Sequence, residues 1–371
     1  MQTDIPSRSD VEALASIQEP GCVSFYIPTN AKANESERSR IEFKNLVRKA
    51  TETLKSSGAG DSLMASIRSS IDDLVDDPDA WQFQANSVAV FVNGSIRRSY
   101  RLPSNLGSAY EVADRFYIKP LLGAVSFPRS AFILALAQKS VRFIEMSADI
   151  PATEIAVPGM PTDVESATWS DLTNGRGSFS WSAEDQKPRV REFAQAIENA
   201  LRPILASSSR PLIIAAAEPL ASVYPLVSTY PQLADEVIAG NPEDRSVEDL
   251  AEAAQRILIG RYARQRVELK ERFQNLAAQD RAVTDVDAVA KAATYKAIDT
   301  LLVDITQRIP GLIDDVSGEV TRNDNDDDMT NYGVVDEVIR RALLSDTRIF
   351  AVEAGDIPGG GPMAASLRFP I

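Results

Sequence analysis

Apolar side chains along this chain follow two patterns, short continuous runs and stripes at helical spacing. The run CVSFYIP (22–28) is β-branched and aromatic, which predicts a buried strand. Apolar residues three and four positions apart predict amphipathic helices over 36–54 and 63–75. The runs SVAVFVN and IRRSYRLP flank Asn93-Gly94, a pair typical of a tight hairpin turn. An N-terminal α/β domain is therefore expected over residues 1–125.

Residues 126–280 predict a second domain with a different order of elements. Three apolar runs, 132–137, 141–146 and 153–157, predict strands, the first two forming a hairpin. A helix is expected to begin near Pro188, because proline is tolerated in a first turn. The run RPLIIAAAEPL predicts a strand buried on both faces, and a long helix follows Ser246, which has Asp249 three positions later.

The last segment, 281–371, repeats a helix and a strand twice and ends with one more strand. Its helices are expected over 285–297 and 333–345, with strands over 298–304 and 348–353. This order predicts a small three-layer α/β/α domain. The whole chain is thus expected to be an α/β protein, mixed α+β in character, with three domains.

The amino-acid composition excludes several kinds of catalytic and metal site. The 371 residues include no histidine and one cysteine, Cys22, which excludes histidine bases, histidine-ligated zinc and an internal disulfide. The net charge of −14 argues against long-range attraction to nucleic acid, although it leaves room for a local basic patch. No apolar run is long enough to span a bilayer, and the polar N-terminus indicates no signal peptide. A cytoplasmic protein without a cofactor is expected.

Three short motifs favour structural roles. Asp324–Asp328 resembles the start of a calcium loop, but Met329 and Val335 stand where an EF-hand needs glycine and glutamate. Gly359–Gly361 lacks the lysine and helix of a phosphate loop, so a tight turn is expected. Glu218 follows a predicted strand without a partner carboxylate. No metal site is predicted.

Several segments together resemble the bacterial archaeo-eukaryotic-type release factor family. CVSFYIPT, FKNLVRKA and RLP…VADRFYIKPLL are similar to its N-terminal domain, and VREFAQAIENALRPIL with PLIIAAAEPLASVYPLVSTYPQLADEVIAGNPEDRS to its middle domain. VAKAATYKAIDTLLVD, VVDEVIRRALL and IPGGGPMAASLRF resemble its C-terminal domain, which is related to that of Pelota and the eukaryotic release factor. The resemblance extends over nearly the whole chain in the right order.

This resemblance implies a three-domain ligand of the ribosomal A site with an RNase H-like middle domain. It further implies contact with ribosomal RNA and with a translation GTPase. In the classical factors a Gly-Gly-Gln loop follows the third strand of the middle domain and reaches the peptidyl transferase centre. The corresponding place here is Asn174–Pro188.

The Asn174–Pro188 loop departs from the family pattern. Gly175 and Gly177 are separated by Arg176, and Gln186 lies well beyond them. The catalytic candidates of the loop are therefore Gly175, Gly177 and Gln186, and each is a weak one. A finger that contacts RNA or a partner without hydrolysis is the alternative, since cations bind phosphate and aromatic rings stack on bases. The residues expected to make those contacts are Arg176, Phe179, Trp181, Lys187, Arg189 and Arg191. A plain surface connection is the third interpretation.

The sequence therefore favours a ribosome-associated, release-factor-like protein acting in rescue, recycling or hibernation, with no peptidyl-tRNA hydrolysis of its own. A divergent peptidyl-tRNA hydrolase is the first alternative. A non-ribosomal acidic adaptor or homo-oligomer is the second, motivated by the 9 basic against 16 acidic residues after position 280. Neither a membrane nor DNA is an expected partner.

Overall fold

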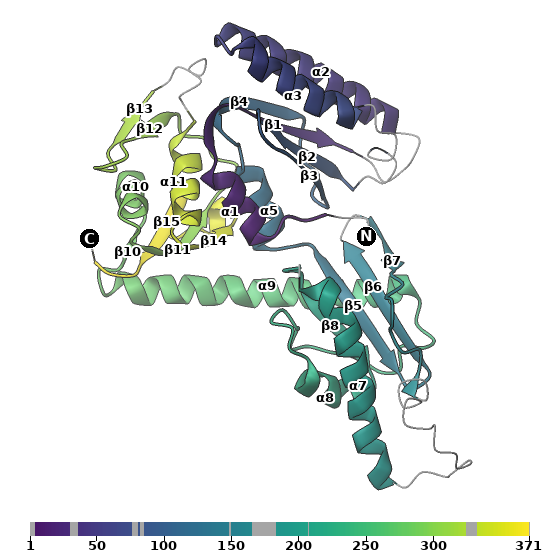
Figure 1. Ribbon diagram of the computed structural model, residues 1–371. Helices are drawn as coiled ribbons and strands as arrows, with labels where there is room; N and C mark the ends of the chain where they lie inside the picture. The colour runs from purple at the N-terminus through teal and green to yellow at the C-terminus, as the bar shows by residue number, and fades with distance from the viewer. Residues whose placement is uncertain are drawn as a thin grey trace. The chain divides into compact units, whose positions relative to one another are not determined.

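The computed structural model describes residues 4–29, 36–75, 81, 85–147, 150–164, 183–206, 208–323 and 332–370, with only the backbone at 36 and 183–187 (Figure 1). The described chain divides into two compact units. One is Pro128–Arg261, and the other joins Gln2–Phe127 to Tyr262–Ile371. The mixed α/β character predicted from the sequence is confirmed, because the described chain forms several sheets and has helices between strands along the sequence.

The unit Pro128–Arg261 is built on a five-stranded sheet in the order β7-β6-β5-β8-β9. Its strands are β5 (Ser130–Ala137), β6 (Ser140–Ser147), β7 (Ile150–Glu154), β8 (Leu212–Ala216) and β9 (Ile238–Ala239). The predicted hairpin is confirmed, because β5 and β6 pair antiparallel, while β8 is parallel to β5 and to β9. The predicted third strand, 153–157, was placed too late in the chain. β7 already pairs at Ile150, and only one further bond, from Ile155 N to Phe143 O at 2.7 Å, extends beyond it.

Three helices belong wholly or partly to this unit: α7 (Ala183–Leu205), α8 (Leu220–Val227) and the first half of α9 (Val247–Ala277). The stripe predicted for α7 is confirmed, since Val190, Phe193, Ile197 and Leu201 are buried with strand residues in one core. The predicted start near Pro188 is wrong, because α7 begins at Ala183 and Pro188 lies in its second turn. Good helix formers between Ala183 and Lys187 support the extra turn, and the proline removes only one backbone bond.

The second unit contains an antiparallel sheet in the order β3-β2-β1-β4. Its strands are β1 (Gln18–Pro28), β2 (Ser87–Val92), β3 (Arg97–Leu102) and β4 (Ala109–Arg115). Helices α2 (Ser36–Ser56) and α3 (Asp61–Val75) cover one face, as Figure 1 shows, and bury Phe43, Leu46 and Ile67 against Phe25 and Val90. The predicted strand, helices and hairpin of this segment are confirmed.

A second sheet in the same unit has the order β10-β15-β11-β14. It combines β10 (Ala282–Val283), β11 (Ile298–Val303), β14 (Arg348–Ala351) and β15 (Met363–Leu367), accompanied by α10 (Val286–Thr294) and α11 (Val334–Leu343). The smaller elements of the unit are α1 (Arg8–Ser16), α5 (Lys119–Ser126), the pair β12 (Gly311–Ile313) and β13 (Val320–Arg322), and a 3-10 turn at Ala354–Asp356.

One hydrophobic core connects the two sheets of this unit. Val11, Tyr26 and Leu121 from the N-terminal segment are buried in the same cluster as Ile298 and Val338 from the C-terminal segment. The far face of the β1 sheet is therefore covered by the C-terminal elements. None of the described helices combines the length and apolarity needed to cross a bilayer.

Candidate functional site

The loop singled out by the sequence lies mostly outside the described residues. Gly175, Arg176, Gly177, Phe179 and Trp181 all fall there. The candidates Gln186 and Lys187 lie in α7, described as backbone only. The structure therefore gives these seven candidates no geometry to test, and their proposed roles remain predictions.

The two described cations of the set, Arg189 and Arg191, lie on α7. Arg189 is half-buried and interacts with a neighbour, whereas Arg191 is exposed beside the exposed Glu192. Residues two positions apart on a helix are separated by roughly 200° around its axis, so their side chains leave opposite sides. Val190 between them is buried in the core. The structure does not bring these two arginines together into one cationic patch.

A buried carboxylate holds α7 in place. Glu198, which is 2% exposed, accepts hydrogen bonds from the hydroxyl of Tyr224 at 3.0 Å, and from the backbone N and hydroxyl of Thr229 at 2.9 and 2.8 Å. Burial acts to raise the pKa of Glu198, but these donors outweigh it and the pKa is lowered. The charged form therefore connects α7 to α8 and the turn that follows it.

A second buried pair in the same unit joins β6 to the start of β8. The Nη1 atom of Arg210 lies 2.7 Å from Oε1 of Glu145, and both side chains are buried. The guanidinium also lies 4.1 Å from the ring centroid of Phe132. With its charge paired and one face covered by a ring, Arg210 is a structural residue.

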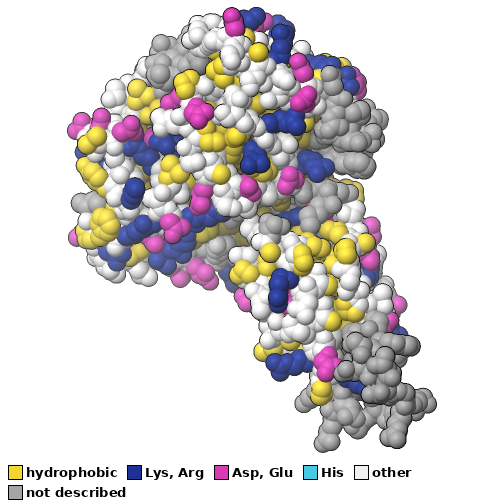
Figure 2. All heavy atoms as spheres, viewed as in Figure 1, with side chains coloured by type: hydrophobic (Ala, Val, Ile, Leu, Met, Phe, Trp, Pro, Cys, Tyr) yellow, Lys and Arg dark blue, Asp and Glu magenta, His cyan; other side chains and the backbone are white. Residues whose placement is uncertain are grey.

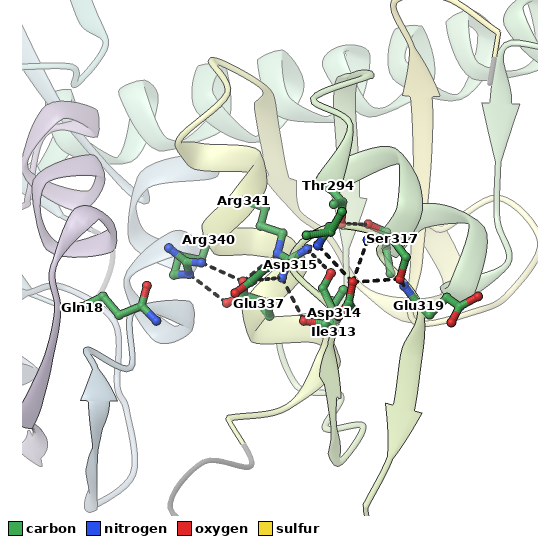
Figure 3. A network of polar contacts seen from close by, with 12 residues as sticks. Gln18, Thr294, Ile313, Asp314, Asp315, Ser317, Glu319, Glu337, Arg340 and Arg341 are labelled. Atoms are coloured by element: carbon green, nitrogen blue, oxygen red, sulfur yellow. Dashed lines mark hydrogen bonds and ion pairs between the residues drawn. The ribbon is translucent and has the colours of Figure 1, made fainter.

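The second unit has a buried charge network on α11 (Figure 3). Glu337, whose side chain is fully buried, accepts from Nε and Nη2 of Arg340, both at 2.8 Å, and from Nε of Arg341 at 2.7 Å. Arg115 of β4 donates to the same carboxylate. Burial acts to raise the pKa of Glu337, yet the bonds and charges of Arg340 and the charge of Arg115 lower it overall.

Arg341 extends this network to the loop between β12 and β13. It donates to Ile313 O at 3.0 Å, to Thr294 Oγ1 at 2.5 Å and to Asp315 Oδ1 at 2.6 Å. Asp314 in the same loop accepts from the backbone N of Ser317 at 2.7 Å, as Figure 3 shows. The network therefore fastens α11, α10 and this loop to one another. Sequence reasoning missed it, since pairs three and four positions apart on a helix usually lie on a solvated face.

The weaker motifs have structural roles or cannot be assessed. Glu218 is exposed and accepts from the hydroxyl of Ser222 one turn later in α8, at 2.6 and 2.7 Å. Gly359 and Gly360 have φ of +82° and +67°, so the predicted tight turn is confirmed. Asp324–Asp328 lies outside the described residues. No group of three histidine, cysteine or carboxylate side chains elsewhere in the described chain could hold a metal ion.

Comparison with known families identifies the first unit. Residues 128–264, which include β5, β8 and α7, match the profile of bacterial archaeo-eukaryotic release factor family 11. The chain carries a domain of the bacterial archaeo-eukaryotic release factor type. No curated protein sequence matches the chain.

Solved structures of Pelota, of Dom34 and of a termination factor align loosely with this chain, over 77 to 99% of its length. A ribosome-bound archaeal Pelota, solved with ABCE1, is 14% identical over 99% of this chain and 96% of its own, with a TM-score of 0.43. S. cerevisiae Dom34, which interacts with Hbs1, is 11% identical over 77% and 74%, with a TM-score of 0.41. The archaeal termination factor aRF1 is 14% identical over 98% of each chain, with a TM-score of 0.25.

Proposed function

We propose that this protein is a ribosome-associated, release-factor-like translation factor that acts in rescue, recycling or hibernation without hydrolysing peptidyl-tRNA itself. The observation that carries the proposal is the match of residues 128–264 to a release factor family, combined with a sequence that has no Gly-Gly-Gln. The segment in which a Gly-Gly-Gln tip is expected, between β7 and α7, instead has Gly-Arg-Gly at 175–177 and no histidine nearby.

The described architecture supports a middle domain of the RNase H-like kind. In Pro128–Arg261 an antiparallel meander, β5 to β7, is followed by α7 and then by β8, which returns parallel to β5. This order places the connection 155–182 after the third strand and before the first long helix of the unit. We assign the remaining segments to an N-terminal domain, 1–125, and a C-terminal α/β/α domain, 281–371, with α9 and the residues after it completing the middle segment 126–280.

The partner in this proposal is the ribosomal A site, reached by the connection between β7 and α7. Arg176, Phe179 and Trp181 on that connection, with Lys187 in the first turns of α7, contact ribosomal RNA through phosphate binding and stacking. A translation GTPase is the second partner, by analogy with the interaction of Dom34 with Hbs1. The protein acts in the cytoplasm and uses no cofactor.

Sucrose-gradient sedimentation of the tagged protein tests the proposal, with lysates of growing and of starved cells at low and moderate salt. Co-migration with 70S particles or subunits is expected, and replacing Asn174–Trp181 by a glycine-serine linker of equal length should abolish it. A circular dichroism spectrum identical to that of the parent protein shows that the variant is folded. Protein that stays at the top of every gradient contradicts the proposal and favours the acidic adaptor.

A release assay distinguishes the non-hydrolytic factor from a divergent hydrolase. Ribosomes carrying labelled peptidyl-tRNA are incubated with the protein and with the Gln186→Ala variant. We expect both to release no peptide above background. Release by the parent protein that is lost in Gln186→Ala would establish the hydrolase instead.

A further inference from the structure

The second unit encloses a cavity that the release-factor comparison does not explain. Its volume is about 420 Å³, within the range of about 300–1,000 Å³ that small-molecule sites occupy. It lies beside β4, the edge strand of the β1 sheet, and is closed by α2, the connection from β4 to α5, and the start of α11.

The cavity wall is cationic in a strongly acidic protein. Five lysine and arginine side chains line it against two carboxylates, Glu111 and Asp336, although the net charge of the chain is −14. Two of the cations, Arg115 and Arg340, are paired with Glu337 behind the wall. Lys49 of α2 is exposed at the cavity, and its ammonium forms no ion pair or hydrogen bond with any described residue, so it is available to an anion.

Aromatic rings form the other part of the wall. Tyr110, Tyr117 and Tyr332 line the cavity, and each is half-buried. Arg115 covers one side of the Tyr332 ring at 3.8 Å from its centroid, and the ammonium of Lys119 lies 5.6 Å from that of Tyr117. Rings backed by cations are good stacking partners for an electron-rich heteroaromatic ring.

One polar atom in the wall lacks a partner. The Oδ1 atom of Asp336 is inaccessible to solvent and has no hydrogen bond within the described chain, while the carboxylate reaches Nζ of Lys119 through Oδ2 at 3.1 Å. Lys119 is itself buried and also donates to Gln307 O at 3.0 Å. Because this oxygen is closed off from solvent, it is also closed off from the cavity, and the pair of Lys119 and Asp336 belongs to the internal structure of the wall.

We propose that this cavity binds a mononucleotide. The base stacks among Tyr110, Tyr117 and Tyr332, and the phosphate binds Lys49 at the rim. An anion and a planar ring are the two features that the wall selects, and a nucleotide combines them. The site is separate from the middle domain, so it extends the proposed function and does not depend on it.

Isothermal titration of the full chain with AMP, GMP, UMP, ribose 5-phosphate and inorganic phosphate tests the proposal. At least one nucleotide should bind below millimolar concentration, and at least about tenfold more tightly than ribose 5-phosphate, since stacking of a base contributes a factor of that order. Binding of phosphate alone as strongly as any nucleotide, or no binding of any nucleotide, would overturn it. Binding of a short oligoribonucleotide but of no mononucleotide would also overturn it, in favour of an RNA contact.

Two variants locate the bound nucleotide. Lys49→Ala should weaken it about tenfold, whereas Lys55→Ala, on an exposed residue of the same helix outside the cavity, should leave binding unchanged. Equal effects of Lys49→Ala and Lys55→Ala would place the ligand elsewhere. Because free protein is used, failure here leaves the sedimentation result intact.

Discussion

The Nε atom of Arg341 lies 2.7 Å from Oε1 of Glu337, one turn earlier in α11, and both side chains are buried. This carboxylate also accepts from Arg340 and Arg115, so three guanidinium groups share it, although Arg341 also pairs with Asp315 and Arg115 with Asp114. Removing the charge of Glu337 leaves Arg340 without its carboxylate partner and the other two arginines with one partner fewer. The stability of the second unit is therefore expected to depend on Glu337.

Glu337→Gln should destabilise the protein by about 3–5 kcal/mol, the usual cost of removing one partner from a buried ion pair. Urea unfolding followed by circular dichroism at pH 7 measures this loss. The matched control is Glu252→Gln, because Glu252 forms an exposed pair with Arg256 at 2.7 Å and should change stability by less than about 1 kcal/mol. Equal effects of the two substitutions would contradict the structural role of the network.

The same carboxylate makes stability depend on acid pH. The pKa of Glu337 is lowered from its ordinary value of 4.5 in the folded state, so its stabilising contribution is complete above pH 4.5 and is lost as pH falls through the lowered value. Unfolding free energies measured from pH 7 to pH 3 should therefore fall less steeply in Glu337→Gln than in the parent protein. Parallel curves would show that Glu337 does not titrate in this way.

Asp285 begins α10 by accepting backbone N–H groups from Asp287 and Ala288 at 3.1 and 3.0 Å. Asp285→Ala should cost about 1 kcal/mol, because two amides lose their acceptor at the helix start. Asp287→Ala, in the same turn but without a capping bond, should cost only about 0.3 kcal/mol through the helix dipole. Chemical unfolding of both variants would reveal the difference.

The buried hydroxyl of Tyr224 is expected to matter more than that of an exposed tyrosine. Tyr224→Phe removes a donor from the buried Glu198 and should cost about 1–3 kcal/mol. Tyr295→Phe serves as the control, because Tyr295 is 53% exposed and its hydroxyl reaches Ser317 O at only 3.3 Å. A loss of stability in the control as large as in Tyr224→Phe would show that the bond to Glu198 is unimportant.

The reactivity of the Cys22 thiol measures how well the β1 sheet excludes solvent. Burial raises the pKa of its thiol to about 11, so thiolate is scarce at pH 8 in the folded state. Reaction with a chromogenic disulfide reagent should be at least about 100-fold slower in the native protein than in denaturant. Since the chain has one cysteine, no other thiol contributes to the signal. Fast native reaction would indicate that the sheet opens locally.

Local patterns predicted most of the regular elements because each depends on neighbouring residues. The stripe from Val190 to Leu201 and the apolar run at Leu212 are explained by one helix face and one buried strand. A missed helix, α1, also had a local signal, since Ser7 and Asp10 form a capping box ahead of Val11 and Leu14. The ends of helices are harder to predict. Whether a helix can begin before Pro188 and hold it in its second turn depends on the surrounding packing.

Contacts between residues that lie far apart in the chain could not be predicted from the sequence. Lys49, Tyr117 and Asp336 lie far apart in the chain, and only the packing of α2, β4 and α11 brings them to one cavity. In the sequence, Glu337 and Arg341 have the spacing of an ion pair on a solvated helix face. Only the fold shows that both side chains are buried. The predicted loop candidates, by contrast, derive from motif and composition, and their roles await the experiments on Asn174–Trp181 and Gln186.

The core that joins Val11 and Tyr26 to Ile298 and Val338 has a consequence for biosynthesis. The residues between these two groups include the whole of Pro128–Arg261, which is continuous in sequence and can fold as soon as it has emerged from the ribosome. The β1 sheet, in contrast, keeps one apolar face uncovered until the C-terminal elements have been made. Contacts of such large sequence separation form slowly. During synthesis this face is therefore a natural substrate for chaperones, and the interval before Ile298 is made is when the chain is most prone to aggregate.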